Sequence, residues 1–224
     1  MDDNYVMIPN NIVQNITYDK TNENSYIQLY GKRTVIYLRQ LIELQNINNN
    51  IYFSSDLILW MSKIQTNIPR ERKYLIKFFT QIHEDSLINF HDKIDFVNLS
   101  PSRFIIAKLN IYEYSKDGKI QNYFMLKDSE YDSIMGYSGN LDKYNLLNLF
   151  CNIKSRIKRN ANDISPAQRV PEVAYPSYET IMHDIFIESD KALKQIHKCF
   201  GRFRAYTFWL CRGYGYEHQR ADTY

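Results

Sequence analysis

Basic residues at helical spacing are the first feature of this chain that could do chemistry. Arg70, Lys73 and Lys77 stand at positions i, i+3 and i+7, so a helix would place them on one face, with Arg72 beside them. Guanidinium and ammonium groups arranged in this way can neutralise phosphates and donate hydrogen bonds to guanine. A solvated helix face has the same composition, so the spacing alone leaves both interpretations open.

Two other groups of cations lie in the second half of the chain. A run of lysines follows Ser189, although Glu188 and Asp190 at its start would repel a phosphate. The densest basic run covers residues 154–160, at the expected end of a helix, where the helix dipole also favours cations. The candidate nucleic-acid contacts are Ser189, Lys191, Lys194 and Lys198 in the first group and Lys154, Arg156, Lys158 and Arg159 in the second.

A predicted turn supplies the last candidates. Lys116 and Lys119 flank Asp117-Gly118, and this turn lies between two segments rich in β-forming residues, which predicts a hairpin. Lysines at a hairpin tip can reach a phosphate or the minor groove. Turns are usually polar without binding anything, so a purely structural role for these two lysines is the alternative.

Residue patterns for catalysis are lacking. The sequence has no phosphate-cradling glycine loop, no nucleophile elbow and no His-apolar-His pair. Zinc could in principle be bound by two histidines and two cysteines near the end of the sequence, namely His197, Cys199, Cys211 and His218. No Cys-x-x-Cys spacing is present among them, so buried thiols are the better interpretation. We therefore expect no enzyme activity, no catalytic residue, no metal and no cofactor.

An internal repeat organises the elements that must position these cations. Residues 51–64 align with residues 174–187 without a gap, matching Tyr52 with Tyr175 and Ser54 with Ser177. About 45 residues before each copy lies a similar marker, YVMIP in one half and YFMLK in the other. Each identity alone could be chance, but their shared order favours two related halves.

The first half has the periodicity of an α+β unit. Apolar positions recur at helical spacing before a short strand, and Ser54 or Ser55 can cap the short helix that follows. The last helix should bury Leu75, Phe78, Phe79 and Ile82. The expected elements are helices over 32–44, from the serine cap to about 63 and over 69–84, a strand over 51–53, and a long hairpin over 104–114 and 120–126.

The second half repeats this order. Helices are expected over 143–159, from Ser177 onward and over 189–200. Residues 201–224 could form a final hairpin, but they are richer in glycine and arginine than the rest, so a foreign or frame-altered end is an alternative. The order of elements in both halves is typical of the winged helix. The predicted fold is α+β, with two tandem winged-helix domains at residues 1–122 and 123–224.

Composition is compatible with a soluble DNA-binding protein without demonstrating one. The 224 residues carry a formal net charge of +3, which many ordinary domains reach. No apolar run is long enough to span a bilayer, and the acidic start of the chain lacks the pattern of a secretory signal. With three scattered cysteines as well, we expect a cytoplasmic protein without a membrane partner.

In organisation the chain resembles the plasmid and phage replication initiators that contain two winged helices. The resemblance covers nearly the whole chain and rests on residues 29–44, 103–126, 142–157 and 176–196 taken together. It implies binding to origin-like repeats in double-stranded DNA, with the C-terminal module gripping the DNA and the N-terminal one also able to form a homodimer. It also implies contacts with host replication proteins.

Other functions fit the same scaffold. A transcriptional or partition regulator would share the DNA-reading parts, and a winged helix can also serve as a protein-interaction module. The acidic start of the second lysine run weakens the transfer of a DNA-binding role to Lys191 and Lys194.

Overall fold

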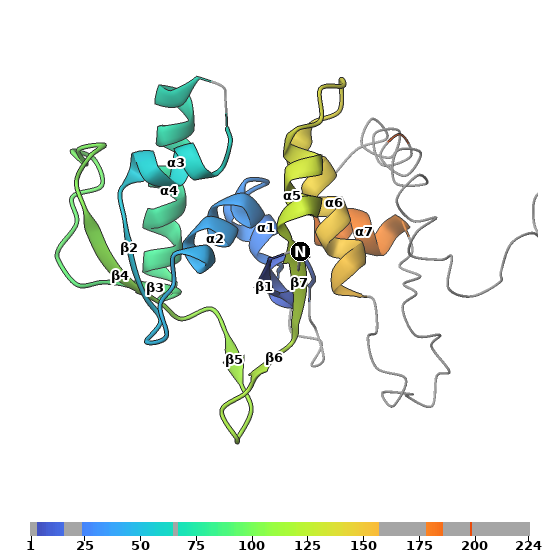
Figure 1. Cartoon of the computed structure of the whole chain (residues 1–224), viewed down its shortest axis with the longest axis horizontal. Coiled ribbons are helices and arrows are strands. Elements are labelled where there is room, and N and C mark those ends of the chain that lie inside the picture. The colour runs from blue at the N-terminus through green and yellow to red at the C-terminus, as the bar shows by residue number, and fades with distance from the viewer. Residues whose placement is uncertain (1–3, 16–23, 65–66, 157–177, 186–197, 199–224) are drawn as a thin grey trace, which may run out of the picture.

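The chain folds into an α+β structure, seen in a computed structural model that describes residues 4–15, 24–64, 67–156, 178–185 and 198 (Figure 1). The predicted helix 189–200 and the uncertain tail 201–224 therefore lie outside the described residues, apart from Lys198.

The first half follows the predicted order of elements. Helix α2 (Thr34–Glu43) leads to strand β2 (Asn50–Phe53), helices α3 (Ser55–Met61) and α4 (Ile68–Glu84), and strands β3 (Ile88–Phe90) and β4 (Ile105–Leu109). The strands form an antiparallel sheet in the order β2-β4-β3. All four residues expected in the core of α4, from Leu75 to Ile82, are buried against it.

Local capping explains where the two helices of this half begin. The Ser54 hydroxyl accepts a hydrogen bond from the backbone N–H of Leu57, which confirms a serine cap for α3. Helix α4 begins one residue earlier than predicted, because the Asn67 side chain accepts the N–H of Arg70 and leaves Pro69 at the second helical position.

One face of α2 differs from the prediction. In the predicted helix 32–44 the apolar spacing places Arg39 and Gln40 on the polar side, but both are buried, at 4% and 0% exposure. Helix α5 (Asp128–Met135) lies beside this face and supplies the Tyr131 ring, 4.0 Å from the Arg39 guanidinium, and the Asp128 carboxylate that pairs with it. The expectation was wrong because periodicity within α2 cannot show that a helix some 90 residues away covers its second face.

The long predicted hairpin is divided among three sheets. Its first arm contains β4 and then β5 (Glu113–Tyr114), and its second contains β6 (Ile120–Gln121) and then β7 (Tyr123–Lys127). Only β5 and β6 pair with each other. Asn122, between β6 and β7, has a positive φ of 51° that redirects the chain, so a single straight hairpin was the wrong prediction.

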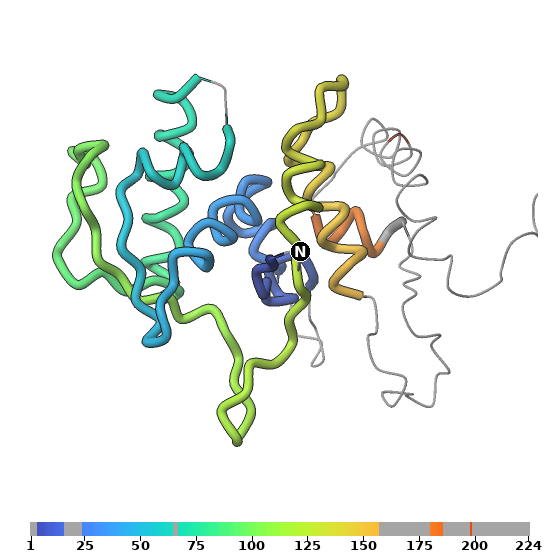
Figure 2. The backbone as a smooth tube through the Cα atoms, viewed as in Figure 1, coloured from blue at the N-terminus to red at the C-terminus, as the bar shows by residue number. Residues whose placement is uncertain are grey.

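The two upstream markers of the sequence repeat pair with each other. Strand β1 (Tyr5–Pro9), which precedes the short 3-10 helix η1 (Asn10–Ile12), runs antiparallel to β7. The register is symmetric about Met7 and Met125, so that the first residue of each marker faces the last residue of the other. These strands lie between the β2-β4-β3 unit and the helices that follow β7 (Figure 2). One sheet thus joins segments from both sides of residue 122.

Helices complete the second side of the molecule. Helix α6 (Lys143–Ser155) begins where predicted, because Asp142 caps the N–H groups of Tyr144 and Asn145. Helix α7 (Tyr178–Asp184) starts directly after the predicted serine cap, which itself lies outside the described residues. Helix α1 (Tyr26–Tyr30) packs near α2, and the Ser25 hydroxyl before it donates to the backbone carbonyl of Asp184.

Candidate nucleic-acid interface

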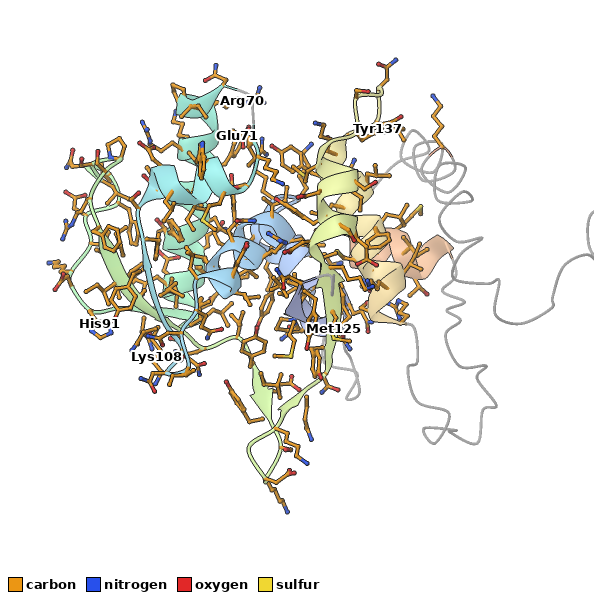
Figure 3. All side chains as sticks on the ribbon, in the orientation of Figure 1. Arg70, Glu71, His91, Lys108, Met125 and Tyr137 are labelled. Carbon is orange, nitrogen blue, oxygen red and sulfur yellow. The ribbon has the colours of Figure 1, made fainter. Side chains whose placement is uncertain are left out.

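The outward face of α4 carries the predicted basic residues. Arg70, Lys73 and Lys77 are all exposed, while the opposite face of the helix is buried in the core. Arg70 lies at one end of this half of the molecule and Lys108, on β4, lies towards the other (Figure 3). The structure thus brings three of the predicted cations onto one accessible helix face.

Arg72 does not share this face. Its Nη2 lies 2.7 Å from a carboxylate oxygen of Asp56, so the side chain links α4 to α3. The pair fixes how the two helices cross and leaves Arg72 only partly exposed. Arg72 therefore has a structural role between two helices, whereas Arg70, Lys73 and Lys77 are exposed to solvent.

The first turn of α4 is held by a buried carboxylate. Glu71 is 3% exposed and accepts two hydrogen bonds from Arg33, at 2.6 Å from Nε and 2.7 Å from Nη2. The hydroxyls of Tyr37 and Tyr144 also donate to Glu71, at 3.5 and 3.4 Å. Such a bidentate pair fixes both the distance and the orientation of its partners. The turn that carries Arg70 is therefore anchored to α2 and to α6.

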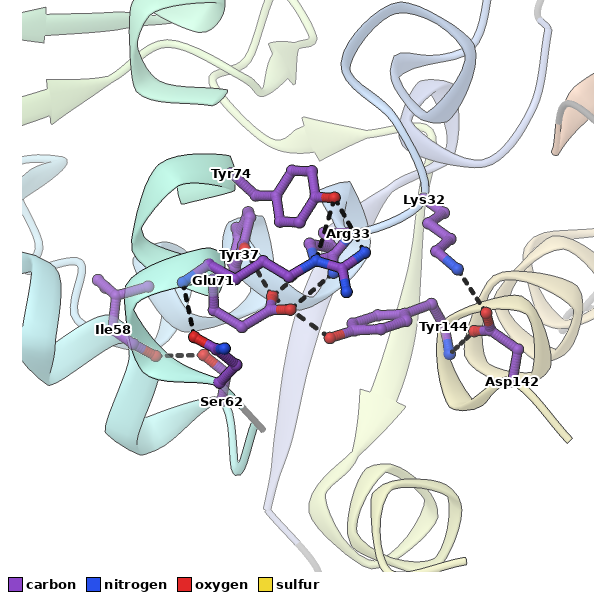
Figure 4. Close-up of polar contacts among 11 residues, drawn as sticks. Lys32, Arg33, Tyr37, Ile58, Ser62, Glu71, Tyr74, Asp142 and Tyr144 are labelled. Atoms are coloured by element: carbon purple, nitrogen blue, oxygen red, sulfur yellow. Dashed lines mark hydrogen bonds and ion pairs between the residues drawn. The ribbon is translucent and has the colours of Figure 1, made fainter. Parts of the chain in front are cut away.

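The rings of Tyr144 and Tyr74 pack beside the Arg33–Glu71 pair and connect it to the surface of the protein (Figure 4). The Arg33 guanidinium lies 4.6 Å from the centre of the Tyr144 ring and 3.9 Å from the centre of the Tyr74 ring. The Arg70 guanidinium lies 5.7 Å from the Tyr74 ring and donates to its hydroxyl at 3.4 Å. We call these four residues, in the order Tyr144, Arg33, Tyr74 and Arg70, the Tyr–Arg stack.

The ionisation of the two tyrosines reflects these contacts. Burial raises the pKa of Tyr144 to about 12, an effect that the Arg33 charge opposes. Tyr74 is on the surface, and the hydrogen bond from Arg70 lowers its pKa below the usual value. The Tyr144 hydroxyl is therefore protonated at neutral pH and can donate to Glu71.

The predicted hairpin lysines lie elsewhere. Lys116 and Lys119 flank the turn between β5 and β6, where Gly118 has the positive φ of 77° that the turn requires. Lys119 Nζ lies 3.3 Å from a carboxylate oxygen of Asp117 within the same turn. This hairpin projects from the molecule on the side opposite to the start of α4 (Figure 1). The structure does not bring these lysines together with Arg70.

Two of the predicted cations at the end of α6 are engaged within the protein. Lys154 pairs with Glu130 of α5, and its side chain is only 13% exposed. Arg156 pairs with Asp184 of α7, which is itself buried. Both residues therefore join helices in the described part of the chain. Of the other predicted sites, Lys198 is exposed, and Lys158, Arg159, Ser189, Lys191 and Lys194 lie outside the described residues.

Sequence reasoning missed the residues that support the basic face. Glu71, Tyr74 and Tyr144 were not singled out, although an acidic residue between Arg70 and Arg72 was a signal that the first turn of α4 contains a partner for a cation. Within the described residues, no group of three or more His, Cys, Asp or Glu side chains is placed to hold a metal ion.

No family model, no curated protein and no solved structure matches this chain. The proposed function therefore rests on the geometry of the described residues. In the same part of the chain, no helix combines the length and the apolar character needed to cross a membrane.

Proposed function

We propose that this chain binds double-stranded DNA, with α4 as a recognition helix. The single observation that carries the proposal is the outward basic face of α4, formed by Arg70, Lys73 and Lys77 directly after α3 and a turn. A helix-turn-helix places its second helix in the major groove, where such cations reach phosphates and base edges.

The topology around α4 supports assigning a winged helix to the first half. The order α2, β2, α3, α4, β3, β4 with a β2-β4-β3 sheet is the arrangement of that motif. In this assignment the wing is the loop over residues 91–104, between β3 and β4, and not the β5–β6 hairpin. Exposed Lys93 and Arg103 lie in this loop. Its backbone is tied to α3, since the Asp56 N–H donates to the Pro101 carbonyl at 3.4 Å.

The second half supports a tandem arrangement. Strand β7 and helices α5, α6 and α7 follow one another as the corresponding elements of the first half do, in line with the sequence repeat. A tandem of two winged helices is consistent with a replication initiator of a plasmid or phage that binds repeated origin sequences, and we favour that role. A transcriptional or partition regulator would use the same DNA-binding face.

A specific observation also favours a protein partner. Trp60 on α3 is 81% exposed and borders a hollow of about 610 Å³ that is lined by apolar side chains including Leu59 and Ile68. The outer face of the β2-β4-β3 sheet exposes Tyr52 and its cross-strand partner Ile106 as well. Exposed apolar side chains of this kind are typical of contact surfaces, either with host proteins or with a second copy of the chain.

The DNA-binding proposal is tested by fluorescence anisotropy with a labelled duplex at several salt concentrations. Replacing Lys73 and Lys77 together by Ala should weaken binding at least about fivefold and lower the salt slope by roughly two, about one for each phosphate contact. Lys108→Ala is the matched control, because this lysine is also exposed but lies away from Arg70. Equal effects of both changes, or binding that does not depend on salt, would contradict the proposal.

A further inference from the structure

We infer that the Tyr–Arg stack positions Arg70 for DNA, so that α6 in the second half of the chain sets the geometry of the basic face in the first half. The inference rests on the proposed function and assigns positioning roles to Tyr144, Arg33 and Tyr74. None of these three side chains needs to touch DNA.

The stack is continuous from the interior to the surface. Its inner layer, the Tyr144 ring, belongs to α6, where Tyr144 is half-buried next to Asp142, the residue that caps the helix and pairs with Lys32. The next layer is the Arg33 guanidinium, whose side chain is 14% exposed. The Tyr74 ring and the Arg70 guanidinium follow at the distances given above. Each pair of neighbouring layers places a cation over an aromatic ring, a contact that is favourable at exposed sites and more so when shielded from water.

Arg33 cannot leave its place in the stack without a large loss. Its Nε and Nη2 donate to the buried Glu71 carboxylate, which would otherwise be an unpaired charge in the interior. The Tyr144 and Tyr74 rings pack against this fixed guanidinium. Tyr74 therefore presents its ring and hydroxyl at a defined point on the surface.

Arg70 gains a preferred orientation from this arrangement. A free surface arginine loses rotamer freedom when a ligand immobilises it, which opposes binding. Here Nε and Nη2 already point to the Tyr74 hydroxyl, and the remaining N–H groups of the five-donor guanidinium are left for a phosphate or a guanine. Lys73 and Lys77 lie outside the stack, and among the described residues neither has such a link to α6.

A double-mutant cycle for duplex binding tests the inference. Tyr144→Leu removes the inner ring, and its effect is measured in the full chain with Arg70 present and with Arg70→Ala. We expect a loss of about three- to tenfold with Arg70 present and of less than about twofold without it. Tyr144→Phe, which keeps the ring, should retain near-normal binding. A cycle between Tyr144→Leu and Lys77→Ala is the control and should be additive.

The outcomes separate the positioning role from a general effect on the fold. Additive effects with Arg70, or an equal coupling to Lys77, would overturn the inference, because both indicate a change in the whole of α4. If Tyr144→Leu does not fold, Tyr74→Leu at the exposed layer replaces it in the same two cycles. If Arg70→Ala leaves duplex binding unchanged, the inference fails. If Lys73 and Lys77 are then also without effect, the proposed DNA-binding face fails with it.

Discussion

Tyr74 is the residue whose ionisation reports most directly on the stack. Arg70 donates to its hydroxyl and lowers its pKa, while burial raises the pKa of Tyr144 and of Tyr131. In an absorbance titration of tyrosinate at 295 nm, we expect an early component below the ordinary tyrosine pKa of about 10. Tyr74→Phe should remove this component, and Arg70→Ala should move it to higher pH.

Ionisation of the Tyr74 hydroxyl should weaken DNA binding. When the pH rises through the lowered pKa of Tyr74, a negative charge forms beside Arg70 and offsets its attraction for phosphate. As the pH is raised, duplex affinity should therefore begin to fall before pH 10 is reached in the unchanged protein. It should fall less in Tyr74→Phe. Titration curves that superpose for the two proteins would show that the hydroxyl is not held by Arg70.

At the scale of elements, local patterns predicted the helices well and their surroundings poorly. Helix α2 follows from apolar spacing, and helices α3 and α4 follow from apolar spacing and from side-chain caps, both of which act within a few residues. The buried state of Arg39 depends on α5, and the division of the long hairpin depends on β1, which pairs with β7. Contacts across the chain of this kind leave no periodic trace in the sequence.

The candidate site divides in the same way. The outward positions of Arg70, Lys73 and Lys77 could be predicted, because i, i+3 and i+7 spacing defines a helix face. The contact between Glu71 and Tyr144 spans 73 residues, and no local signal indicates it. A single sequence could show that the first turn of α4 holds a carboxylate among cations, but not which residues enclose it.

The β5–β6 hairpin provides a test at this scale. Its lysines lie outside the β2-β4-β3 sheet and on the side of the molecule away from Arg70. Replacing Lys116 and Lys119 by Ala should change duplex affinity by less than about twofold, compared with at least about fivefold for the matched pair Lys73 and Lys77. Anisotropy at one low salt concentration is sufficient. A loss as large as that of the α4 pair would return the hairpin to the interface.

For the whole molecule, the described contacts indicate that the two halves depend on each other. The β1–β7 sheet joins them, the Arg39 guanidinium is enclosed by Asp128 and Tyr131, and the Tyr131 hydroxyl donates to the Ser62 carbonyl at 3.0 Å. Lys63 pairs with Asp132 as well. Both helices of the proposed recognition motif are thus fastened to helices that follow residue 122.

Separating the chain after residue 122 should consequently abolish the native state of the first half. A fragment 1–122 would leave β1 without its partner strand and would take Asp128 and Tyr131 away from Arg39, which would keep Glu43 of its own helix as an ionic partner. The apolar side chains that pack against β7 and α6 would also be exposed to water, which opposes folding of the fragment. We expect a broad thermal transition by circular dichroism and little amide protection in α2, and we expect that adding fragment 123–224 restores both. A sharp, independent transition of fragment 1–122 with protected amides in α2 and α4 would instead show that residue 122 separates two autonomous domains.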